Sequence, residues 1–181
     1  KQIMTLDNNL IMIIVSASFI GAASGYLGSL LILRRMALVG DALSHVALPG
    51  IAIALMININ PFLGALAFLT IAALGIWAIE ERSELSTETL IGIFFTASLS
   101  IGILLTEDVE ILEALFGDIT KVGGIDVVFA VIISSLAIYI TKKISRGLLL
   151  DTISKDLAKS AGIDTSKIDL TFLLLIGIVV A

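Results

Sequence analysis

Residues 10–33 read LIMIIVSASFIGAASGYLGSLLIL, a run of 24 residues without a charged side chain. A helix rises about 1.5 Å per residue, so a run of this length can cross the roughly 30 Å hydrocarbon core of a bilayer. Arg34 and Arg35 follow it directly, which is typical of a membrane span and not of a cleaved signal peptide. The stretch therefore predicts a helix that crosses a membrane.

The rest of the chain repeats this pattern. The 181 residues are 58% hydrophobic and 15% charged, against about 25% charged in a soluble domain. Further apolar runs predict spans at 38–57, 62–79, 90–105 and 125–140, with a sixth from 169. We expect one transmembrane domain over 1–181, of the all-α polytopic class. Because the sequence starts at Lys1 and stops inside an apolar run, we interpret it as an incomplete chain.

The positions of the 11 cationic residues predict the orientation. Nine of them lie on alternate connections, at Arg34, Arg35, Arg82, Lys142, Lys143, Arg146, Lys155, Lys159 and Lys167. Lys1 and Lys121 are on the other side. The positive-inside rule then puts the N-terminus outside and the 141–168 connection in the cytoplasm.

Small residues recur along the first span, at Ala17, Gly21, Gly25 and Gly28. Such a stripe lets another helix approach closely. We favour packing within one subunit over a dimer contact. The chain has no cysteine, which excludes disulfides and thiolate metal ligands within it.

The second span contains an unusual polar stretch, VGDALSHVALPGIA, at residues 39–52. Asp41 and His45 are four residues apart, so they share one helix face. Pro49 lacks an N–H and Gly50 loosens the helix, which predicts a helix break beside the pair. Ionisable residues inside a membrane usually serve a function, although the pair could also bond internally in a dry core. Asp with His suits zinc, manganese or iron(II), but two ligands cannot hold a metal alone.

These residues support a family resemblance. RRMALVGDALSHVALPGIAIAL, at 34–55, resembles the signature of the permease subunits of zinc- and manganese-type ABC importers. The resemblance continues through TETLIGIFFTASLSIGILL, EALFGDI and DLAKSAGIDTSKIDLTFLLLIGIVVA, and so covers nearly the whole chain. It implies a homodimeric subunit of the cobalamin-importer architecture in the plasma membrane of a prokaryote. It also implies that Asp41 and His45 handle a divalent zinc, manganese or iron ion as cargo, with no permanently bound cofactor.

The chain contains no G-x-x-x-x-G-K-[ST] motif, so it is not expected to hydrolyse a nucleotide itself. The resemblance implies a separate ATP-binding subunit, and the 141–168 connection is the expected coupling element. Within it, a short helix can start at Ser154 and stop at Gly162. Its candidate contact residues are Lys155, Asp156, Leu157, Lys159 and Gly162. An ordinary solvated loop is the alternative.

The outer connection is acidic. It carries Glu107, Asp108, Glu110 and Glu113, which could concentrate cations or steer a positively charged extracytoplasmic metal-binding protein. A plain hydrophilic cap is an equally good interpretation. We expect lipid and protein partners and no nucleic acid.

Two other functions compete with ATP-driven metal import. A secondary metal-ion transporter would need neither an ATPase nor the long basic connection. An intramembrane aspartyl protease needs two paired carboxylates, and the only other candidate for pairing with Asp41 is Asp126 at a span edge. A Ser44–His45 arrangement is poor because neighbours on a helix point about 100° apart.

Overall fold

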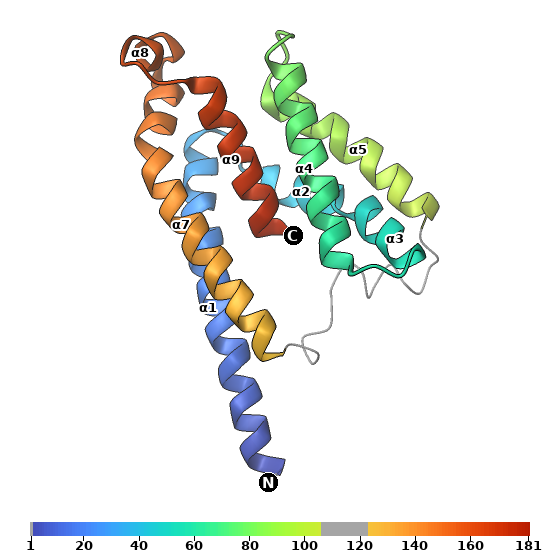
Figure 1. The fold of residues 1–181 in the computed structure, drawn as a ribbon. Helices are drawn as coiled ribbons and strands as arrows, with labels where there is room; N and C mark the ends of the chain where they lie inside the picture. Colours follow the sequence, from blue (N-terminus) through green and yellow to red (C-terminus); the bar gives the residue numbers. More distant parts are fainter. Residues whose placement is uncertain (1, 106–122) are drawn as a thin grey trace.

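The computed structural model describes residues 2–105 and 123–181, and the regular elements within these ranges are all α-helices (Figure 1). Their bounds are α1 Gln2–Leu33, α2 Val39–Val46, α3 Leu48–Met56, α4 Pro61–Glu80, α5 Thr87–Leu105, α7 Gly124–Ile153, α8 Lys155–Ser160 and α9 Thr165–Val180. Five stretches are long and apolar enough to cross a membrane, at Leu10–Leu33, Val39–Met56, Pro61–Glu80, Thr87–Leu105 and Gly124–Ile153. The all-α polytopic class predicted from the sequence is confirmed.

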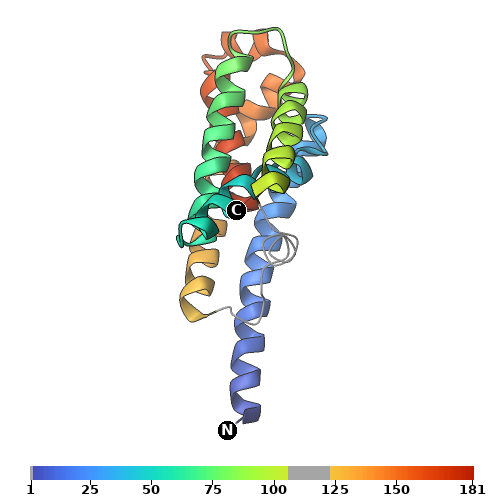
Figure 2. The same ribbon diagram turned by 90° about the vertical axis from the view of Figure 1, so that its right-hand side faces the viewer.

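The helices form two groups with α9 between them. Helix α1 lies along α7 on one side, and α3, α4 and α5 pack together on the other, as the two views in Figure 1 and Figure 2 show. Helix α9 contacts both α4 and α7. Helix α8 and the connection at 81–86 lie at the same end of the molecule, opposite the N-terminus. The basic 155–159 region and Arg82 thus share one end, as the orientation prediction requires.

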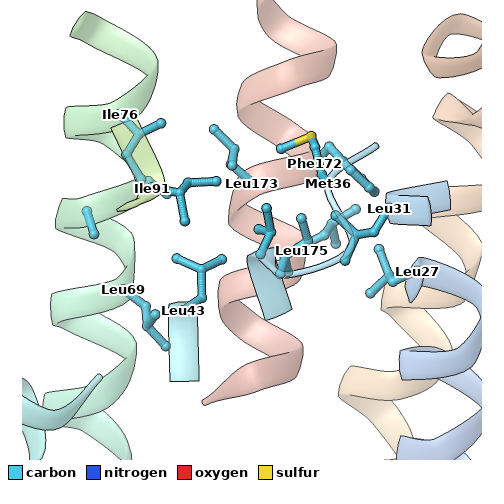
Figure 3. Close-up of a cluster of buried hydrophobic side chains, with 14 of the residues drawn as sticks. Leu27, Leu31, Met36, Leu43, Leu69, Ile76, Ile91, Phe172, Leu173 and Leu175 are labelled. Atoms are coloured by element: carbon cyan, nitrogen blue, oxygen red, sulfur yellow. The ribbon is translucent and has the colours of Figure 1, made fainter. Parts of the chain in front are cut away.

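The hydrophobic core is built around α9 and α2 (Figure 3). Leu43 of α2 and Phe172 of α9 are among the largest fully buried side chains. The core residues labelled in the close-up come from several helices: Leu27, Leu31, Met36, Leu43, Leu69, Ile76, Ile91, Phe172, Leu173 and Leu175. The middle of α9 therefore ties the α1 side of the molecule to the α4–α5 side.

Two tight helix ends set the path into and out of the second span. Arg35 has a φ of 61°, and the N–H of Met36 donates to the carbonyl of Leu31 at 2.8 Å. Asn58 has a φ of 56° and follows α3 in the same way. A left-handed residue at this position with a six-to-one hydrogen bond is the Schellman helix ending, which usually uses glycine. The chain therefore reverses sharply after Leu33, within a few residues of α2.

Helix starts follow their capping residues. The Asn60 side chain accepts a 2.9 Å hydrogen bond from the N–H of Phe62, and Pro61 is the first residue of α4. The Ser86 hydroxyl accepts from the N–H of Thr89 at 3.3 Å, so Ser86 is the cap of α5. These bonds satisfy backbone donors that have no partner inside the helix.

Helix α7 extends well beyond the span at 125–140 expected from the sequence. It is continuous from Gly124 to Ile153, about 45 Å at 1.5 Å per residue. A bilayer core is only about 30 Å thick. Residues 141–153, assigned from the sequence to a connection, are therefore helical, and α7 leads directly to α8. Periodicity did not reveal this because the continuation is polar and charged.

The small-residue stripe on α1 has no close packing partner in the part of the chain that the structure describes. A Cβ added at Gly21, Gly25 or Gly28 would meet nothing within 4 Å, and Ala17 is exposed. Packing of the stripe within one subunit is therefore not seen among the residues that the structure describes, and that interpretation stays a prediction. Helix α1 contacts α7 through a different face, on which Leu27 is buried.

Candidate metal site

Helix α2 carries both members of the predicted metal pair. Asp41 lies in its first turn and His45 in its last turn. These positions put the carboxylate near the positive end of the helix dipole and the imidazole near the negative end. Val39, Leu43 and Val46 form the opposite face and are buried. Burial of that face fixes the rotation of the helix, and it leaves Asp41 exposed and His45 half-buried.

An aromatic contact holds the imidazole of His45. The ring lies edge-on to Phe95 of α5, with centroids 5.4 Å apart and an angle of 65° between the planes. Its Nδ1 is buried and has no hydrogen-bond partner among the residues that the structure describes. The ring is thus positioned by apolar packing without engaging this nitrogen. A neutral imidazole in this state has a lone pair available for a ligand.

The groups required by the enzymatic alternatives are engaged in local helix structure. The hydroxyl of Ser44 donates to the backbone oxygen of Asp41 at 2.6 Å and does not bond to His45. The carboxylate of Asp126 accepts the N–H of Gly123 at 2.8 Å, which caps the start of α7. Neither arrangement resembles a nucleophile with its base or a pair of carboxylates that share a proton.

The interruption in the second span lies at Ala47, between α2 and α3. The N–H of Ala47 donates to the carbonyl of Leu43 at 3.3 Å, and the N–H of Ile51 donates to the carbonyl of Ala47 at 3.0 Å. Pro49 and Gly50, to which the sequence pattern assigned the break, directly follow this interruption in the first turn of α3. A proline is accepted there because the first N–H groups of a helix have no intrahelical partner.

Glycine contacts fix the helix that follows the metal pair. A Cβ added at Gly50 would overlap the backbone oxygen of Gly64 on α4, and the reverse substitution would overlap that of Gly50. A Cβ added at Gly102 of α5 would lie 3.1 Å from the Cβ of Leu48. Helix α3 is therefore held tightly between α4 and α5. This packing gives α2 a rigid neighbour on its C-terminal side.

The pair does not form a complete metal site by itself. Among residues 2–105 and 123–181, no group of three or more His, Cys, Asp or Glu side chains could hold a metal ion. A four-coordinate zinc site or a larger manganese site needs more than two ligands. An ion bound by Asp41 and His45 must therefore take ligands from water, from other residues of the whole protein or from another subunit.

The short helix expected in the basic connection is present as α8. The Ser154 hydroxyl accepts from the N–H of Leu157 at 3.4 Å, and Gly162 ends the helix with a φ of 75°. Ala158 is fully buried, whereas the side chain of Leu157 is 56% exposed. Lys155, Asp156 and Lys159 are also exposed. Helix α8 thus presents an apolar residue flanked by charges away from the bundle.

A cleft of about 410 Å³ opens beside α8. Lys155 and Lys159 line it together with Glu80 and Glu81 of the α4 end. Helix α4 is joined to α9 across this cleft, because the indole N–H of Trp77 donates to the Ser166 hydroxyl at 2.9 Å. The two lysines of α8 therefore line the same cleft as the acidic residues at the end of α4.

The acidic residues of the outer connection, Glu107, Asp108, Glu110 and Glu113, lie outside the residues that the structure describes. Their suggested roles stay predictions.

A second polar cluster, which the sequence did not predict, lies around Arg34. Arg34 forms 2.6 Å ion pairs with both Asp151 and Asp169. From sequence alone, Arg34 counted only as an orientation charge, and the two aspartates did not stand out in a polar connection. Their separations from Arg34, 117 and 135 residues, leave no local signal.

Comparison with known proteins gives consistent matches over most of the chain. The family described as the ABC 3 transport family matches residues 6–181. Manganese transport system membrane protein MntC of Listeria monocytogenes is 32% identical over 170 residues, covering 92% of this chain and 61% of that protein. High-affinity zinc uptake system membrane protein ZnuB of Haemophilus influenzae is 30% identical over 164 residues, covering 86% and 61% respectively.

A solved structure agrees with these matches. The structure of PsaBC from Streptococcus pneumoniae in complex with Fab is 28% identical in sequence and superimposes with a TM-score of 0.74. The match covers 95% of this chain and 64% of that one. The chain thus spans about three fifths of the length of the relatives that it matches.

Proposed function

The chain belongs to the ABC 3 transport family, and on this basis we propose that it forms the membrane-spanning core of a permease subunit that imports divalent metal ions. The relatives named above are manganese and zinc systems, so the proposed cargo is one of these two ions. Iron, which the resemblance also implied, appears in neither of these names. ATP hydrolysis takes place in a separate subunit, and this chain is not itself an enzyme.

The observation that carries the proposal is the pair on α2. Asp41 provides a carboxylate, and His45 provides an imidazole whose Nδ1 has no partner among the described residues. A hard oxygen with a borderline nitrogen suits both Mn²⁺ and Zn²⁺. Two ligands without a thiolate bind an ion strongly enough to replace part of its hydration shell and weakly enough to release it, as conduction requires.

The remaining ligands come from a second copy of the chain in this proposal. Two copies that face each other across a dimer axis would bring together two carboxylates and two imidazoles. That set completes a tetrahedral zinc site or supplies part of a manganese site. The exposure of Asp41 within one chain supports this arrangement, because an unpaired carboxylate facing lipid would be costly.

Helix α8 is the proposed contact with the ATP-binding subunit. Its exposed Leu157 is flanked by Lys155 and Lys159, which offers an apolar anchor within a charged rim. The distribution of cations supports an orientation with α8 in the cytoplasm and the N-terminus outside, in the plasma membrane of a prokaryote. An extracytoplasmic metal-binding protein would then deliver the ion at the opposite face.

Metal uptake by site variants tests the proposal. Full-length permease is expressed with its ATPase in cells that lack other importers, and uptake of labelled manganese, zinc and iron is measured. His45→Ala, Asp41→Ala and Asp41→Asn should each reduce uptake to background, since each removes a ligand or its charge. Uptake should also fall as the pH is lowered, because protons compete with the ion for the imidazole.

Ser44→Ala is the matched control. Ser44 is exposed on the same helix, and among the described residues its hydroxyl bonds to the backbone oxygen of Asp41. It should retain wild-type uptake. Wild-type rates for all three metals in Asp41→Asn and His45→Ala would assign the pair a purely structural role. Uptake that persists with a hydrolysis-defective ATPase would favour a secondary transporter.

A further inference from the structure

The guanidinium of Arg34 joins three helices at the end of the molecule that carries α8. Its two nitrogens lie 2.6 Å from Asp151 of α7 and 2.6 Å from Asp169 of α9. The side chains of Arg34, Asp151 and Asp169 are only 14%, 1% and 12% exposed. The guanidinium also lies 5.8 Å from the centre of the Phe172 ring. The three charged side chains thus form a largely buried ion cluster. Exposed ion pairs, in contrast, contribute little to protein stability.

The cluster depends on Arg34 more than on either aspartate. One cation lies between two carboxylates, and the second oxygen of Asp151 is buried without a partner among the described residues. Without the guanidinium, two carboxylates would remain close together in a partly buried site. Only a planar fork can serve two acceptors on two different helices in this way, and a lysine ammonium lacks that geometry.

The two aspartates flank α8 in the sequence. Asp151 is near the C-terminal end of α7, and Asp169 is in the second turn of α9, with α8 between them. If α8 shifts and takes the ends of α7 and α9 with it, Asp151 and Asp169 therefore move and displace Arg34. Since Asp151 and Asp169 are held by the same side chain, a movement at either end of the segment reaches the same point.

Arg34 is connected to the metal pair through the short turn between α1 and α2. It directly follows α1, and the tight turn at Arg35 leads through Met36 into α2, which carries Asp41. Met36 and Leu43 belong to the same buried cluster as Phe172. The α1–α2 turn is thus held by the ion pairs of Arg34 and by the apolar packing of Met36, which is labelled in Figure 3, and both involve α9.

We propose that Arg34 is a positioning residue that transmits displacement of α8 to the metal pair on α2. The inference rests on the proposed function, since it requires α8 to be moved by an ATPase. In this mechanism Arg34 does not touch the ion. It links the position of the segment 151–169 to that of Asp41 and His45, so that nucleotide-driven movement of α8 changes the geometry of the pair.

The test uses Arg34→Lys, which keeps the charge and removes the fork, with Arg35→Lys as matched control. Arg35 is exposed and forms no ion pair with any described residue. Full-length permease with its ATPase is reconstituted in liposomes, and manganese or zinc import is measured per ATP hydrolysed. Arg34→Lys should lower this ratio roughly fivefold or more, which corresponds to the low end of typical coupling between sites. Arg35→Lys should match the wild type.

Asp169→Asn should also lower the number of ions imported per ATP, because it removes the Arg34–Asp169 ion pair and leaves the Arg34–Asp151 pair. In both variants, metal affinity without nucleotide and basal ATPase activity should stay within about twofold of wild type, as expected for a residue outside the binding site. A purely structural role predicts instead that affinity, ATPase activity and melting temperature fall together.

Single cysteines give a readout of movement, because this chain has none of its own. Leu38→Cys, just before α2, and Ser160→Cys, on α8, are both at exposed positions. Adding nucleotide should change the alkylation rate at both positions in the wild-type background. With Arg34→Lys, the change should persist at 160 and disappear at 38.

The outcomes separate the two hypotheses. A wild-type permease that does not import metal on ATP hydrolysis refutes the proposed function and this inference with it. A wild-type permease that imports metal, with an unchanged transport ratio in Arg34→Lys and Asp169→Asn, overturns the inference alone. The same holds if nucleotide still changes alkylation at 38 in Arg34→Lys.

Discussion

The two polar clusters in this membrane protein use the same kinds of side chain in opposite ways. Arg34, Asp151 and Asp169 are largely buried and hold one another at 2.6 Å. Asp41 and His45 have no ion pair between them, Asp41 is exposed, and Nδ1 of His45 has no partner among the described residues. The charges of the first cluster are paired with one another inside the fold, whereas the polar groups of the second cluster are free to bind a ligand. A polar residue at membrane depth is therefore informative only when its partners are known.

The largest expected difference between the clusters is in stability. Arg34→Ala leaves two carboxylates unpaired and should lower the free energy of unfolding by about 3–5 kcal/mol, the usual cost of breaking a buried ion pair. Asp41→Ala removes an exposed side chain that the fold does not use, so its effect should stay within about 0.5 kcal/mol. Unfolding of full-length variants in detergent micelles measures both. Equal losses of unfolding free energy in Arg34→Ala and Asp41→Ala would mean that the fold depends on both clusters to the same extent.

The next effect concerns the packing that supports the metal pair. Gly50→Ala should force α3 and α4 apart, because the new Cβ overlaps the backbone of Gly64. The expected destabilisation is about 1–3 kcal/mol, as for other overpacked sites, with a loss of metal uptake. Gly92→Ala on α5 is the matched control, since a Cβ there meets nothing within 4 Å. Thermal unfolding should separate the two variants, and similar melting temperatures would contradict the close contact.

The smallest effect is expected at an exposed ion pair. Asp164 caps α9 and lies 2.8 Å from Lys167, and these hydrogen bonds lower the pKa of Asp164 from its usual 3.8. A lowered pKa stabilises the folded state above the unfolded-state value, and this stabilisation is lost as the pH falls through the folded-state value. Asp164→Asn keeps the cap and removes the charge. Its melting temperature should be slightly below wild type at pH 7, and the two should converge as the pH falls below 3.8 and through the lowered pKa of Asp164.

This last measurement sharpens the contrast between buried and exposed ion pairs. Both partners are exposed, so solvent and salt screen the interaction. Adding salt should therefore reduce the difference between Asp164→Asn and wild type. A difference as large as that of Arg34→Ala would show that burial does not control the strength of these pairs.

The candidate site could be predicted from sequence only in part. The spacing of Asp41 and His45 placed them on one helix face, and the apolar run around them made their presence unusual. The capping serine at 154 and the glycine at 162 delimited α8, because helix ends depend on local hydrogen bonds and local backbone conformation. The same local rules assigned the helix break to Pro49 and Gly50, and the interruption lies just before them, at Ala47.

What the sequence determined by itself is the membrane-spanning, all-α character of the protein, the two ends of α8 and the polar pair in the second span. These properties follow from hydropathy, periodicity and capping, which act over a few residues. Only the tertiary structure decided that Arg34 binds Asp151 and Asp169, that Gly50 meets Gly64, and that the glycines of the stripe on α1 meet no other described residue closely. The partner of a charge or of a glycine lies on another helix, and its identity depends on how all the helices pack.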